Sequence, residues 1–105
     1  MAGENIPCPE KSEVVAVGTP VVRNCTGRAF NHAISIIVKP TAGGTVTVEF
    51  SNSPLCVEDQ ANPANVWIDS GNGAMAAATE VARYAPCKAY RVTATAQPAL
   101  LETKG

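Results

Sequence analysis

Charged side chains are scarce in this chain of 105 residues. Only 16% of them are Asp, Glu, Lys or Arg, against roughly 25% in an average globular protein. Eight basic residues stand against nine acidic ones, which gives a net charge of −1. A nucleic-acid binder needs a basic surface that displaces counterions, so this balance excludes nucleic acid as a partner. A surface with few charges costs little to desolvate, which favours assembly with other proteins.

Long hydrophobic runs are also missing. The apolar stretches are far shorter than the ~20 residues that a membrane helix needs, so we expect no membrane partner. The N-terminal segment 1–9 has no basic start followed by an apolar run, so we expect no secretory signal and a protein made in a cytosol. The length supports one domain with one modest core.

The usual metal ligands are few and badly spaced. His32 is the single histidine, and the cysteines at 8, 25, 56 and 87 form no C-x-x-C pair. A zinc site usually shows ligands at such short spacing, so we expect no metal and no cofactor. Buried thiols that act as small apolar side chains are favoured over a secreted, disulfide-bonded domain, and the pairing of four cysteines stays open among three arrangements.

Catalytic constellations are not apparent. Cys25 and His32 could form a nucleophile and base, but the pattern carries no orienting group or oxyanion hole. The acidic pair Glu58-Asp59 and the turn at 69–73 lack the regular oxygen spacing and the closing glutamate of a calcium loop. Solvated turns are the favoured interpretation of both, and we expect the protein not to be an enzyme.

Period-two alternation is the dominant pattern in the chain. In residues 44–51 it places Val46, Val48 and Phe50 on one face and polar residues on the other, as in an antiparallel strand with one wet side. A run rich in β-branched residues over 33–38 predicts a central strand that Pro40 ends. Because a short Gly-Gly loop joins the two segments, we predict that 33–38 and 45–51 pair as a hairpin.

Further strands are predicted at 13–17, 21–25, 66–68, 90–96 and 99–103. The segment 79–84 suits a helix or a strand, and its surroundings favour an extended conformation. In 90–96, the inward positions are Tyr90, Val92, Ala94 and Ala96. The tyrosines are expected near strand ends with wet hydroxyls, and Trp67 is interpreted as a core residue rather than an exposed binding hot spot.

Short strands at this spacing predict an all-β fold. We expect a small antiparallel β-sandwich, jelly-roll or Ig-like, over residues 13–105. Residues 1–12 show no period and contain Pro7 and Pro9, so they are expected to form an extended N-terminal arm. Proline presets the extended shape, which lowers the entropy lost when such an arm docks on a partner.

The second half of the chain has a distinctive layout. The segment Gly-Thr-Val-Thr-Val-Glu-Phe-Ser at 44–51 is followed by a loop with proline and acidic residues, then by Trp67 and a Gly-Asn-Gly turn. A late strand reads Ala-Tyr-Arg-Val-Thr-Ala-Thr at 89–95. Over residues 43–98 this layout resembles small structural proteins of tailed bacteriophages, namely capsid decoration (cement) proteins and head-fibre base domains.

The resemblance implies a non-enzymatic virion structural protein that binds the outside of a phage capsid and is made in the cytoplasm of the host bacterium. Its partner would be the major capsid protein or another virion protein, and a homo-oligomer is left open. The capsid-contact residues expected on the arm are Ile6, Pro7 and Pro9. The alternative is a β-sandwich module of a tail or fibre that recognises a receptor or glycan.

Overall fold

The computed structural model describes residues 11–25, 34–83 and 87–104. The regular elements within these ranges are β-strands, ordered along the chain as β1 (Lys11–Val15), β2 (Val21–Asn24), β3 (Ile34–Pro40), β4 (Thr45–Ser51), β5 (Ile68–Asp69), β6 (Thr79–Arg83), β7 (Ala89–Thr95) and β8 (Ala99–Lys104). Residues 11 and 12, at the end of the expected arm, lie in β1. In the part of the chain described, no helix is long and apolar enough to cross a membrane.

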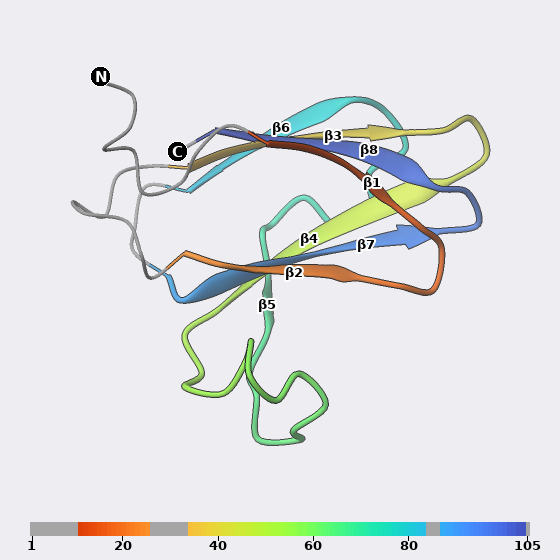
Figure 1. The fold of residues 1–105 in the computed structure, drawn as a ribbon. Helices are drawn as coiled ribbons and strands as arrows, with labels where there is room; N and C mark the ends of the chain where they lie inside the picture. Colours follow the sequence, from red (N-terminus) through yellow and green to blue (C-terminus); the bar gives the residue numbers. More distant parts are fainter. Residues whose placement is uncertain (1–10, 26–33, 84–86, 105) are drawn as a thin grey trace.

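The strands form two four-stranded sheets that pack face to face (Figure 1). The first sheet has the order β1-β8-β3-β6 and the second has the order β2-β7-β4-β5. The pairs β1 with β8, β2 with β7, β3 with β6 and β4 with β5 are antiparallel. The chain therefore folds back on itself as one long antiparallel ribbon, with the turn of the ribbon between β4 and β5. This ribbon is rolled into two layers, which is the jelly-roll topology. The expected β-sandwich is confirmed, and so is the extended conformation of the ambiguous segment, which forms β6.

The predicted hairpin between 33–38 and 45–51 is wrong. β3 pairs with β6 and β8, whereas β4 lies in the other sheet and pairs with β5 and β7. Both strands have one apolar side, and these sides face each other across the core instead of lying side by side in one sheet. Alternation shows which face of a strand is buried. It does not show whether another strand with the same pattern is a neighbour in the same sheet or lies in the facing sheet.

The connection from β3 to β4 is a crossing turn between the sheets. The Gly44 N–H donates to the Thr41 carbonyl at 2.9 Å, and the Thr41 hydroxyl donates to the Pro98 carbonyl at 2.7 Å. Pro98 belongs to the connection between β7 and β8, which crosses at the same end of the sandwich (Figure 1). A Cβ atom on Gly44 would lie 2.7 Å from the Cβ of Gln97, so this close packing of the two crossings requires glycine.

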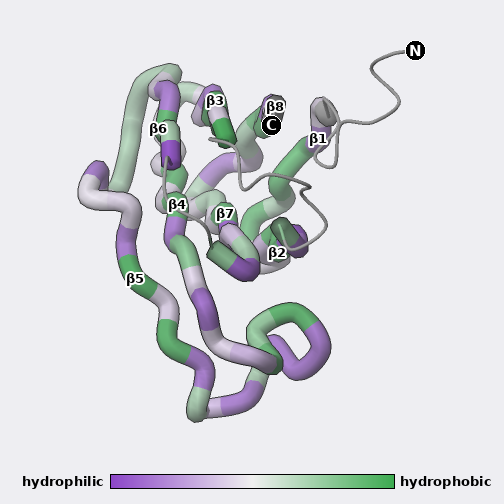
Figure 2. The backbone as a smooth tube through the Cα atoms, turned by 90° about the vertical axis from the view of Figure 1, so that its left-hand side faces the viewer, coloured by the Kyte–Doolittle hydropathy of each residue, from purple (hydrophilic) through white to green (hydrophobic). Residues whose placement is uncertain are grey.

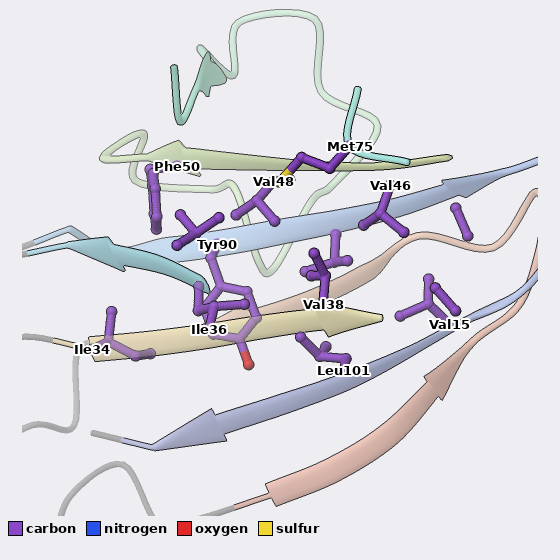
Figure 3. Packing of buried hydrophobic residues seen from close by; sticks show 14 of the residues in the cluster. Val15, Ile34, Ile36, Val38, Val46, Val48, Phe50, Met75, Tyr90 and Leu101 are labelled. Carbon is purple, nitrogen blue, oxygen red and sulfur yellow. The ribbon is translucent and has the colours of Figure 1, made fainter. Parts of the chain in front are cut away.

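The core lies between the sheets and follows the alternation of the strands (Figure 3). Val46, Val48 and Phe50 of β4 are buried as expected. From the first sheet they face the buried side chains of Val15, Ile34, Ile36, Val38 and Leu101. The prediction for β7 holds for Tyr90, Val92 and Ala94. It is wrong for Ala96, which is exposed with a φ of +72°, because the chain has already left the strand to cross to the first sheet.

Tyr90 lies inside the sandwich, so its expected wet hydroxyl is also wrong. The side chain is 4% exposed, and its hydroxyl points toward the first sheet (Figure 3). The hydroxyl is hydrogen-bonded to Thr103 of β8. Burial raises the pKa of Tyr90 to about 12. The bond joins the two sheets across the core, because a buried hydroxyl needs a partner inside the protein.

A charge placed inside this core tests the assignment of faces. Val48→Asp should lower the free energy of unfolding by more than about 4 kcal/mol, because it buries an unpaired carboxylate. Thr47→Asp is the matched control, since the neighbouring side chain lies on the other side of β4 and is partly exposed. Urea denaturation of both variants measures the difference. Equal losses would contradict the assigned register.

The buried tyrosine predicts a loss of stability in alkali. An unfolded tyrosine ionises near pH 10, whereas folded Tyr90 stays neutral until about pH 12, so the unfolded state alone gains from ionisation in between. The free energy of unfolding should therefore fall as the pH rises through this range. Tyr90→Phe should remove on the order of 2 kcal/mol of that fall. Urea denaturation of the wild type and of Tyr90→Phe near pH 10 and near pH 12 measures this fall. If the hydroxyl were exposed, the free energy of unfolding would change equally with pH in both proteins.

Candidate functional site

The residues singled out for chemistry do not come together in the part of the chain described. His32 and the expected capsid contacts Ile6, Pro7 and Pro9 lie outside the described residues. Cys25 is buried in the main core. Among the described side chains, no group of His, Cys, Asp and Glu could hold a metal ion. The turn at 69–73 is organised by Asp69, whose carboxylate accepts the Gly71 and Gly73 N–H groups at 2.7 and 3.1 Å.

The two outer faces of the sandwich differ in what covers them. Residues 52–67, which we call the covering loop, fold over the outer side of the second sheet (Figure 2). The loop is closed at its base by the Val66 N–H, which donates to the Ser53 hydroxyl at 2.7 Å. It buries a second apolar cluster that consists of Val22, Cys56 and Ala89, with Val57 and Trp67 packed against it. Cys56 is fully buried and carries a free thiol, as the sequence favoured.

Polar contacts hold the covering loop to the sheet. The Lys88 ammonium donates to the Pro54 carbonyl and forms an ion pair with Glu58 at 3.2 Å. The pKa of Glu58 is lowered, first by its own backbone N–H and then by Lys88. These contacts connect the start of β7 to the first half of the loop, so the loop is an ordered part of the fold.

Trp67, interpreted as a core residue, is half-buried and packs against this second cluster instead of lying between the two sheets. The Arg91 guanidinium lies 4.4 Å from the centre of the indole ring. The same guanidinium forms an ion pair with Glu49 at 2.9 Å. Sequence reasoning missed the cluster because the residues that cover Trp67 come from a loop with no periodic pattern. The alternation of β7 places Arg91 on the outer side of the strand, and this position was the available sign of a contact on that side of the sheet.

The outer side of the first sheet has no such cover among the described segments (Figure 2). Val14, Ile37 and Leu100 are 64%, 37% and 43% exposed there. Val14 lies directly opposite Leu100, and Ile37 lies one diagonal step away. We call this surface the open face, and its outward residues are Ser12, Val14, Ser35, Ile37, Lys39, Glu80, Ala82, Leu100 and Glu102.

Two carboxylates flank the exposed isoleucine of the open face. Ile37 is opposite Glu80 on one neighbouring strand and opposite Glu102 on the other. The Ser35 hydroxyl donates to the Glu80 carboxylate at 2.6 Å. This row of acid, isoleucine and acid lies beside Leu100 and Val14. It is suited to binding another surface, because large apolar side chains in a contiguous group gain from burial.

Comparisons with known proteins add no assignment. No family model matches the sequence, and neither the curated proteins nor the solved structures give a significant match.

The attachment of the covering loop can be tested through Cys56. Lys88→Ala removes the bonds to Pro54 and Glu58 and should raise the rate at which Cys56 reacts with a thiol reagent, because the covering loop would open more often. Mass spectrometry of the peptide that contains Cys56 measures the rate. Lys39→Ala, on the open face, is the control. An unchanged rate in the Lys88 variant would show that the bonds do not hold the loop.

Proposed function

We propose that the protein is a non-enzymatic virion structural protein that binds the outer surface of a phage capsid as a decoration protein, with the open face against the shell. The observation that carries this proposal is the uncovered apolar row of Val14, Leu100 and Ile37. The covering loop lies over the outer side of the second sheet, whereas no described segment lies over the outer side of the first sheet. Burial of these three side chains against another protein is favourable.

The resemblance to phage structural proteins supports the same proposal through a defined part of the fold. Its two strand motifs, 44–51 and 89–95, form β4 and β7, which pair along their whole length at the centre of the second sheet. Trp67 lies on the outer side of that sheet and contacts Arg91 of β7. The motif residues thus build the layer behind the open face.

The size of the open face favours a second contact. Four strands at about 4.8 Å spacing and about six residues long cover roughly 400 Å² in projection. A specific interface buries about 800 Å² on each partner. The N-terminal arm expected from the sequence, with Ile6, Pro7 and Pro9, would supply the remaining area, since an extended segment adds contact without enlarging the domain.

The alternative function is a tail or fibre module that binds a receptor or glycan. The jelly-roll architecture serves both viral capsid domains and lectin domains, so analogy of fold supports either use. The open face favours the capsid, because a flat apolar row fits a protein surface better than a polar sugar. Binding to a glycan array by the isolated protein, without affinity for capsids, would favour the alternative.

Co-sedimentation with capsids of the phage that encodes the chain tests the proposal. The full chain should sediment with capsids. A chain lacking residues 1–10 should bind much more weakly, while its melting temperature changes by only a few degrees, because β1 begins at Lys11 and remains intact. Equal binding by the shortened chain would refute the arm as a contact. Absence of binding by the full chain would refute the decoration role.

A further inference from the structure

The carboxylates of the open face differ from the other glutamates that the structure describes. Glu13, Glu49 and Glu58 each form an ion pair, with Arg23, Arg91 and Lys88 in turn. Glu80 and Glu102 form no ion pair with a described cation, and the contact of Glu80 is the hydroxyl of Ser35. In a chain with so few charges, two glutamates on one face that form no ion pair with a described cation are a specific feature.

The register fixes how these two carboxylates lie. Glu80, Ile37 and Glu102 occupy one line across three neighbouring strands, with the isoleucine in the middle. Adjacent strands are about 4.8 Å apart, so the backbones that carry the two acids are about 10 Å apart. Lys39 also lies on this face, opposite Leu100, and forms no ion pair with either glutamate. Lys104 is opposite Ser35 at the end of β8.

A partner that covers Ile37 must also cover both carboxylates. A purely apolar surface would remove their water without replacing it, which is strongly unfavourable for a charged group. An acidic surface would add repulsion. A second copy of this chain would bring four such carboxylates together, with Lys39 as the described cation of each face. Basic side chains on the partner would form ion pairs with the two carboxylates. These ion pairs would offset the hydration that the carboxylates lose when they are covered.

We infer that the open face binds a protein surface that presents an apolar contact for Ile37 between two Lys or Arg side chains about 10 Å apart, which pair with Glu80 and Glu102. This inference rests on the proposed function and assigns the chemistry of the shell surface that the protein covers. Arginine suits these positions best, because its planar fork can pair with a carboxylate through two hydrogen bonds.

The test measures binding to the same capsids as a function of salt. The double variant Glu80→Gln with Glu102→Gln keeps the size of both side chains and removes both charges. It should bind at least tenfold more weakly at low salt, and its affinity should depend much less on ionic strength than that of the wild type. Ile37→Thr keeps a β-branched side chain in the strand and should also weaken binding about tenfold.

Matched controls come from the covering loop on the opposite side of the molecule. Glu58→Gln removes an exposed charge, and Val66→Thr removes an exposed apolar group. Both should bind within about twofold of the wild type. Thermal melting of every variant shows whether a loss of binding reflects unfolding.

The outcomes separate the two claims. Wild type that binds capsids while the double glutamine variant binds equally well, with the same salt dependence, overturns the inference and leaves the decoration role standing. Wild type that fails to bind capsids overturns both. A wild-type dimer in sedimentation velocity that Ile37→Thr dissociates would assign the open face to a second copy and would also overturn the inference.

Discussion

The structure depends on burying two apolar sheet faces against each other. Each strand contributes one side to this contact, and the contact decides where every other side chain lies. Polar groups between the sheets include two pairs, Tyr90 with Thr103 and Arg23 with Glu13, the second at the side where β1 and β2 lie. The two outer faces are free of this constraint, and the chain uses them differently. One carries the covering loop, and the other remains the open face.

Alternation in the sequence predicted the buried positions well, because burial on one side of a strand leaves a direct period of two. It identified Val46, Val48 and Phe50 and most of β7 correctly. It could not identify strand partners, because in a rolled ribbon neighbours in the sheet are distant in sequence. The supposed hairpin failed for that reason. Ala96 failed because an apolar residue continued the period past the point where the strand ends.

The candidate site was less accessible to sequence reasoning than the core. Ile37, Glu80 and Glu102 come from three separate strands, and only the sheet register makes them neighbours. Ile37 also belongs to a run of apolar residues that indicated a central strand, and this run gave no sign of which residues face outward. Its exposure follows from the absence of a described layer over the first sheet. The low charge of the chain did point to a surface suited to assembly, although it could not say which one.

The place of β8 has a consequence for how the molecule is made. β8 lies between β1 and β3, so the open face cannot form before β8 has been synthesised. An emerging chain can close the ribbon at β4 and β5 first, but the first sheet must wait for its central member. Incomplete chains would therefore lack the binding surface altogether. A chain that stops before β8 would leave β1 and β3 without the strand that joins them.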